Sequence, residues 1–289
     1  MTAVSIAGAS AGAKSASAAT GRVARVPVLI TGAETAEGRA TARRLLRSGG
    51  EVRVFVDEAT PAEVVEQFRS ARCKVARGTL DDEGHLETAA EQVHTIVHLG
   101  GGPMTAPDVV LDDTATVLSA AIGAGCRRLV WASHVGVDSP QGNAYLEACA
   151  ETEELLADAP LETVVIRRAL TYGPGDPLTA ALAAGAVPSQ AFESTHQPLY
   201  VADLALVIAE SDRVRGGVSD LAITVTLTGP TEILLGGFAD LLAAPGRDLT
   251  AVPTLTPVVE GLLARDLVID DALTGPTDIN EGLDRLSRE

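Results

Sequence analysis

A glycine-containing turn that begins at residue 32 has the spacing of a dinucleotide phosphate site. An apolar run ends at Thr31, the turn spans residues 32–38, and a helical pattern follows. Such a strand-to-helix turn lets backbone N–H groups approach a pyrophosphate at the positive end of the helix. Gly32 and Gly38 occupy the first and last glycine positions of the pattern. Thr35 replaces the middle glycine, and its side chain leaves less room for a phosphate to approach the backbone, without forbidding it. With Ala36, these residues form a candidate phosphate site, although glycine at a tight turn is also commonly structural.

An acidic residue stands where a ribose contact is expected. The second apolar run is followed by Asp57, nineteen residues past Gly38, at the position where the dinucleotide pattern has an acid that accepts the ribose 2′-hydroxyl. Because such an acid repels a 2′-phosphate, the sequence favours NAD(H) over NADP(H). Glu58 is a second candidate at the same place. The alternative is that Asp57 and Glu58 only begin a solvated loop.

Strand-like and helix-like patterns alternate from Val26 onward, which indicates βαβ units and a parallel sheet. The strand-like runs are nearly all apolar, as expected for strands covered by helices on both faces. We therefore predict an α/β fold with a Rossmann-type doubly wound parallel sheet over residues 27–170. The predicted strands are 26–30, 52–56, 73–76, 95–99, 127–133 and 163–168, and the predicted helices are 40–49, 62–68, 85–92, 109–124 and 144–157.

The two ends of the chain have a different character. After Tyr172 the pattern becomes irregular, while residues 199–210 and 221–227 are typical of a helix and a strand that return to the main body. We expect residues 171–289 to form a smaller, interleaved C-terminal substrate lobe. Residues 1–26 are rich in Ala, Ser and Gly and are predicted to be a flexible tail.

The composition excludes several classes of function. A net charge of −17 argues against a nucleic-acid partner, which would need a footprint of Lys and Arg. No apolar run approaches the ~20 residues of a membrane helix. The 3 cysteines are too few and too widely spaced for a disulfide framework or a metal site, so we expect a cytoplasmic protein without a metal. The bias toward Ala, Gly, Arg and Asp suggests a bacterial source rich in GC.

Five segments, residues 78–101, 120–134, 164–176, 199–210 and 227–247, resemble in order the motifs of the extended and atypical short-chain dehydrogenases/reductases, which include epimerase/dehydratase-like and NmrA-like branches. The resemblance runs from about residue 27 to about residue 250. It implies a bound nicotinamide dinucleotide and epimerisation, dehydration or carbonyl reduction of a small molecule. The cofactor contacts that it implies are Thr79, Leu80, Leu99, Gly100, Gly101, Cys149, Arg168 and Leu170.

The chain departs from that family at the residues that do the chemistry. The family has a Tyr-x-x-x-Lys pair on one helix face, in which the lysine lowers the pKa of the tyrosine. Here Cys149 stands in place of the lysine beside Tyr145, so we expect Tyr145 to keep a pKa near ~10. Ser133 and His134 replace the tandem serines, with His134 at the usual catalytic position. Arg168 replaces a proline, where its charge either holds an anionic substrate or pairs with an acid on the surface.

Three functions stay open on these residues. The first is an oxidoreductase acting on a small molecule, in bacterial secondary metabolism, with His134 as acid and base and with Ser133 and Tyr145 beside it. The second is an inactive NAD(P)-binding regulator or sensor, and the third is a pocket reused for cyclisation or dehydration. An enzyme should have a partly apolar pocket that His134 and Tyr145 face, whereas a regulator should have a filled one. We also expect a homodimer through residues 109–124 and 144–157.

Overall fold

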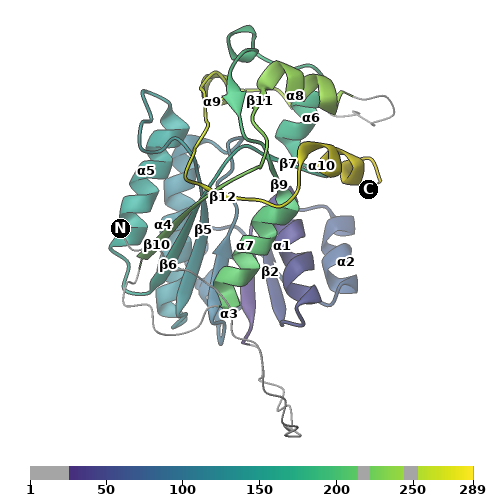
Figure 1. Ribbon diagram of the computed structural model, residues 1–289. Helices are drawn as coiled ribbons and strands as arrows, with labels where there is room; N and C mark the ends of the chain where they lie inside the picture. The colour runs from purple at the N-terminus through teal and green to yellow at the C-terminus, as the bar shows by residue number, and fades with distance from the viewer. Residues whose placement is uncertain (1–25, 214–221, 244–252, 289) are drawn as a thin grey trace, which may run out of the picture.

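The computed structural model describes residues 26–213, 222–243 and 253–288, and its centre is one parallel sheet (Figure 1). Eight strands lie in the order β12-β10-β6-β5-β4-β1-β2-β3, which reverses direction between β1 and β4. Ligands of such sheets bind at this reversal, outside the carboxyl ends of the strands. The predicted doubly wound α/β fold is confirmed. The strands are β1 Val28–Thr31, β2 Val52–Val56, β3 Lys74–Arg77, β4 Thr95–His98, β5 Arg128–His134, β6 Glu162–Arg168, β10 Ala222–Thr228 and β12 Leu273–Thr274.

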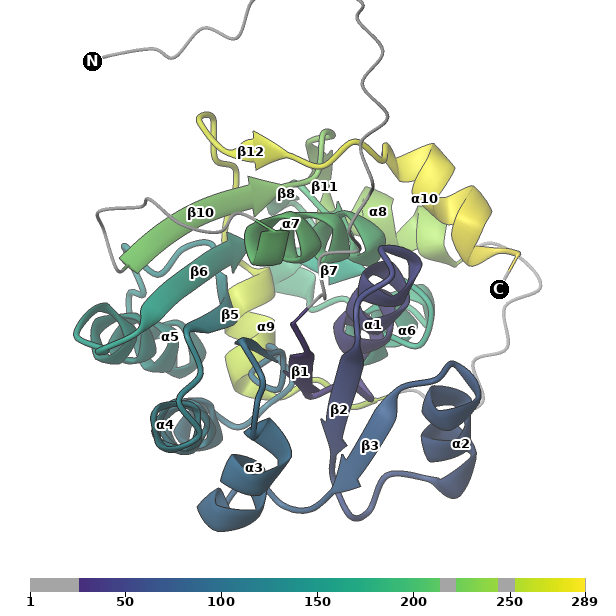
Figure 2. The same cartoon turned by 90° about the horizontal axis from the view of Figure 1, so that it is seen from below.

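Helices cover both faces of the sheet, as the apolar strands require. The helices α1 (Ala36–Arg47) and α7 (Val201–Arg213) pack together on one face (Figure 2). The other face carries α3 (Glu83–Ala90), α4 (Pro107–Gly123) and α5 (Ala144–Ala157). Every residue of β5 is buried between these layers. The remaining crossover helix, α2 (Ala62–Ser70), joins β2 to β3.

A smaller lobe lies over the carboxyl edge of the sheet (Figure 1). Its apolar side chains, among them Leu170, Tyr172 and Phe238, form a second buried cluster. The lobe is interleaved with the sheet because β10, β12 and α7 come from the same part of the sequence but join the main layers. The boundary at residue 170 stays a prediction, and the predicted tail lies, apart from Val26, outside the described residues. The elements of the lobe are β7 Thr171–Tyr172, α6 Pro177–Ala183, β8 Thr195–His196, β9 Leu199–Tyr200, β11 Ile233–Leu234, α8 Leu235–Leu242, α9 Pro257–Leu263 and α10 Ile279–Leu286.

The described residues contain neither a helix suited to cross a membrane nor a cluster of metal-binding side chains. No helix among them is long and apolar enough to cross a membrane. No group of three or more His, Cys, Asp or Glu side chains gathers there in a way that would hold a metal ion.

Candidate functional site

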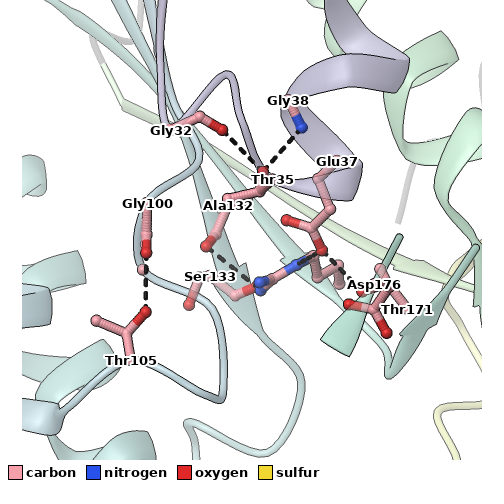
Figure 3. Close-up of polar contacts among 12 residues, drawn as sticks. Gly32, Thr35, Glu37, Gly38, Gly100, Thr105, Ala132, Ser133, Thr171 and Asp176 are labelled. Carbon is pink, nitrogen blue, oxygen red and sulfur yellow. Dashed lines mark hydrogen bonds and ion pairs between the residues drawn. The ribbon is translucent and has the colours of Figure 1, made fainter. Parts of the chain in front are cut away.

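The turn between β1 and α1 is packed too tightly for side chains at its first and last positions. Gly32 has a φ of +68°, and a Cβ there would lie 2.7 Å from the backbone nitrogen of Gly100. A Cβ on Gly38 would meet the carbonyl oxygen of Gly32, so both glycines are needed for close backbone contact. Thr35 instead caps α1: its hydroxyl accepts from the N–H of Gly38 at 3.0 Å and donates to the oxygen of Gly32 at 2.8 Å (Figure 3).

The first turn of α1 keeps two free donors despite this cap. Within the described part of the chain, the N–H groups of Ala36 and Glu37 have no hydrogen-bond acceptor. Free N–H groups at a helix N-terminus suit a phosphate. The free N–H groups of the turn can therefore bind the pyrophosphate of a dinucleotide. The N–H group of Gly38 cannot, because it already donates to the hydroxyl of Thr35.

Two carboxylates lie together where the adenosine ribose of such a ligand would bind. Asp57 follows β2, is exposed, and accepts from the N–H of Ala59 at 2.7 Å. Glu34, within the glycine turn, is half-buried; burial raises its pKa, and the negative charge of Asp57 raises it further. Oε2 of Glu34 is buried without a hydrogen-bond partner in the described structure. Glu58 and Thr79 are exposed, and Leu80 packs against the core.

A pocket of about 160 Å³ opens between the carboxyl edge of the sheet and the lobe. We call it the sheet-edge pocket. Its walls are partly apolar: Met104 and Leu178 line it together with the polar residues Thr35 and His134. The predicted site residues that line it are Thr35, Ala36, Leu99, Gly100, His134, Arg168 and Leu170. Those that do not are Gly32, Gly38, Asp57, Glu58, Thr79, Leu80, Gly101, Ser133, Tyr145 and Cys149.

His134 lines this pocket, and its side chain is almost completely buried. Its Nδ1 lies 2.8 Å from the oxygen of Val135, and because a carbonyl only accepts, Nδ1 carries the proton. Nε2 is left with a lone pair and has no partner among the described residues. Burial lowers the pKa of His134 to about 3, and the nearby charge of Arg168 contributes to the shift. At neutral pH the ring is therefore neutral and a weak base.

Tyr145 does not face the pocket. Its side chain is fully buried, and its hydroxyl donates to the carbonyl oxygen of Gly101 at 3.1 Å. Burial raises its pKa well above 10, which corrects the expectation that the value stays near ~10: the sequence shows the missing lysine but not the burial. Burial also raises the pKa of Cys149 to about 12, so its thiol is neutral.

Ser133 points away from the pocket as well. Successive side chains of a strand face opposite sides of the sheet, so Ser133 and its neighbour His134 cannot both reach the pocket. The hydroxyl of Ser133 donates to Oε1 of Glu153 on α5 at 2.6 Å. Glu153 also binds Arg167, which places Ser133 in a polar network on the α5 side of the sheet.

A buried ion pair joins the glycine turn to the end of β6. Nε of Arg168 lies 2.7 Å from Oε1 of Glu37, and both side chains are almost completely buried. Arg168 also donates to the oxygen of Ser133 at 2.7 Å, and Thr171 donates to the same Glu37 oxygen at 2.8 Å (Figure 3). Burial disfavours the charge of Arg168, but the carboxylate of Glu37 outweighs it and raises its pKa. The expected acid partner of Arg168 is thus an interior residue and does not lie on the surface.

Asp176 adds a further acid to the pocket wall. It caps α6 by accepting from the N–H and the hydroxyl of Thr179 at 2.6 Å each. Burial raises its pKa to about 6, although these two hydrogen bonds lower it. Asp176, Glu34 and Glu37 were not predicted from the sequence. Glu34 and Glu37 could have been singled out in the sequence, because carboxylates repel a pyrophosphate and are therefore uncommon in a phosphate-binding turn.

Comparisons with known proteins agree with this geometry. Residues 32–210 match the family model described as NAD(P)H-binding. No curated protein matches the sequence. Among solved structures, UDP-glucose 4-epimerase from Thermotoga maritima with UDP-glucose has a TM-score of 0.67 at 15% identity, with 91% of this chain and 97% of that chain covered.

Two further structures contain NAD. WbmG from Bordetella bronchiseptica in complex with NAD gives a TM-score of 0.66 at 21% identity, covering 92% of this chain and 94% of that chain. UDP-glucose 4-epimerase from Thermus thermophilus in complex with NAD gives 0.62 at 18% identity, covering 90% and 97%. At these identities the likeness shows the fold. The family match covers more than half of the chain, and the chain therefore belongs to the NAD(P)H-binding family and has the fold of the epimerase structures named above.

Proposed function

We propose that this protein binds NAD(H) at the glycine turn and a small molecule in the sheet-edge pocket, and that it acts as a dinucleotide-dependent regulator or sensor. The sheet-edge pocket is open, as expected for an enzyme, and His134 lines it, but Tyr145 does not. The observation that carries the proposal is this position of Tyr145. Its hydroxyl is buried and donates a hydrogen bond to the carbonyl oxygen of Gly101, and Cys149 occupies the position where the family has a lysine. A residue in that state neither reaches a substrate nor gives up its proton at neutral pH.

The preference for NAD(H) rests on the pair of carboxylates beside the turn. Asp57 and Glu34 lie close enough for the charge of Asp57 to raise the pKa of Glu34. A 2′-phosphate placed between them would meet two negative charges, whereas a ribose hydroxyl can donate to either. The free N–H groups of Ala36 and Glu37 would hold the pyrophosphate.

A second candidate function is that of an oxidoreductase that acts on a small molecule of bacterial secondary metabolism, as expected from the sequence. One observation favours it: Nε2 of His134 is an unpartnered acceptor in the pocket wall. In that function a bound nicotinamide ring supplies hydride exchange. His134 would accept a hydrogen bond from a substrate hydroxyl and so orient it, while its low pKa makes proton removal inefficient.

Calorimetric titration of the full chain with NAD⁺, NADH, NADP⁺ and NADPH tests the binding step. We expect micromolar binding of NAD(H) that weakens in Asp57→Ala and is unchanged in Glu63→Ala, an exposed acid on α2. Absence of binding for all four nucleotides would overturn both candidate functions.

A screen of carbonyl compounds, followed by NADH absorbance, separates the two candidates. A regulator should give no turnover with any compound, in wild type or in Tyr145→Phe. Turnover that is lost in His134→Gln but kept in Tyr145→Phe would establish the oxidoreductase instead.

A further inference from the structure

A second concave site lies along α1, and Ala36 lines both this site and the sheet-edge pocket. It is a groove of about 620 Å³ between α1, α7 and α10. Alanines of the two packed helices, Ala40 on α1 and Ala205 on α7, line it. The volume falls within the range of small-molecule pockets, about 300–1,000 Å³.

Four arginines line this groove, although the chain as a whole has a net charge of −17. Arg43, Arg44 and Arg47 come from the last turns of α1, where spacings of three and four residues put them on one side of the helix. Arg285 comes from α10, and its guanidinium lies 5.7 Å from the ring centre of Tyr200. A helix C-terminus favours cations, which accounts for arginines at the end of α1 but not for a concave surface between three helices.

The groove has more cationic than anionic side chains to offer a ligand. Its two acids are already engaged: Asp203 accepts from the N–H and hydroxyl of Thr277 at 2.9 and 2.8 Å, and Glu281 binds Arg285 at 2.5 Å. In the described part of the chain, Arg44 and Arg47 have no carboxylate within ion-pair distance. Nε of Arg44 is moreover buried without any hydrogen-bond partner there. A buried guanidinium nitrogen without an acceptor is costly, which indicates that an anion completes this site.

We propose that this groove binds a phosphorylated small molecule, independently of the dinucleotide at the glycine turn. Guanidinium groups bind phosphate oxygens in a bidentate manner, and several of them on converging helices can hold more than one phosphate oxygen. Arg44 and Arg47 would make the main contacts. Arg285, held in place by Tyr200 and Glu281, would close the groove from the α10 side.

The test is calorimetric titration of the full chain with inorganic pyrophosphate at low ionic strength. We expect Arg44→Gln/Arg47→Gln to weaken binding about tenfold or more, since charge-assisted hydrogen bonds are lost. The matched control Arg69→Gln/Arg127→Gln removes two exposed arginines elsewhere and should leave the affinity unchanged. If the double variant fails to fold, Arg47→Gln alone serves, because Arg47 is exposed. No binding to wild type, or equal loss in both double variants, would overturn the proposal.

Two further titrations distinguish specific binding in the groove from binding at the glycine turn and from simple charge attraction. If pyrophosphate binds the glycine turn, Thr35→Asp would abolish binding and the arginine variant would not, and the proposal would fall. Citrate binding as tightly as pyrophosphate would show simple charge attraction and overturn the phosphate assignment. The proposal expects citrate to bind more weakly, and Thr35→Asp to keep the pyrophosphate binding that Arg44→Gln/Arg47→Gln loses.

Discussion

Nε of Arg168 lies 2.7 Å from Oε1 of Glu37 in the interior of the protein, although the two residues are 131 positions apart in the sequence. Glu37 belongs to the turn that would hold a pyrophosphate, and Arg168 ends the strand beside His134. The pair therefore fixes the glycine turn to the floor of the sheet-edge pocket. It also neutralises a carboxylate that would otherwise repel a phosphate at the same turn.

Removing one member of this pair should cost much more than removing both. Glu37→Gln leaves the guanidinium of Arg168 buried without a counter-charge, and we expect the free energy of unfolding to fall by about 3–5 kcal/mol. Glu37→Leu/Arg168→Met removes both charges and should cost clearly less than Glu37→Gln. Urea unfolding of the three proteins measures the difference. Equal losses for the single and double variants would show that the two charges are not coupled.

The ion pair between Glu37 and Arg168 is a contact that the sequence alone does not predict, whereas some strands and helices are predicted. The strand at 52–56 was predicted with the bounds that the structure has, because an apolar β-rich run carries its own signal. The helix after the turn was predicted from residue 40 but begins at Ala36, since residues 36–39 lack an apolar period and the start depends on the Thr35 cap. The partners of Arg168 and Tyr145 depend on strand register and helix packing between distant segments, and neither is visible in local sequence.

Acid should destabilise the protein through three buried histidines, His98, His134 and His196, because burial lowers the pKa of each ring. Burial lowers the pKa of His98 to about 4 and that of His134 to about 3, whereas unfolded histidines titrate near ~6.5. Between about pH 6.5 and pH 4 the unfolded chain therefore binds more protons, and the free energy of unfolding falls as the pH falls. Each histidine contributes up to ~1.4 kcal/mol per pH unit. Asp176, whose pKa is raised to about 6, acts in the opposite direction and offsets part of the loss.

Urea unfolding at a series of pH values measures this slope. We expect His98→Gln/His134→Gln to lose most of the slope of the unfolding free energy against pH. Asp176→Asn should make this slope steeper than in wild type, because the folded protein then lacks the carboxyl that binds a proton near pH 6. A histidine variant whose stability curve runs parallel to that of wild type would contradict the assignment of the acid sensitivity to these two rings.

Coenzyme preference should change when the paired carboxylates lose their charge. Glu34→Gln/Asp57→Asn removes both negative charges beside the ribose position, so a 2′-phosphate no longer meets repulsion. We expect the ratio of NADPH to NADH affinity to rise roughly tenfold, equivalent to ~1.4 kcal/mol. Glu63→Gln, an exposed acid on α2, is the control and should leave the ratio unchanged. An unchanged ratio in the double variant would rule out these carboxylates as the source of the preference.

The exposed side of α4 and α5 is the predicted dimer interface. The two helices pack against each other, and α4 presents to solvent the large apolar side chain of Ile122, which is 45% exposed. We expect the wild-type protein to have about twice the chain mass of 29.6 kDa in light scattering coupled to size-exclusion chromatography. Ile122→Glu places a charge within that face and should shift the protein to the monomer mass. The control Leu241→Glu, at a similarly exposed position on α8, should leave the dimer intact. A monomeric wild type would contradict the predicted interface of α4 and α5. Dissociation by Leu241→Glu but not by Ile122→Glu would contradict it as well.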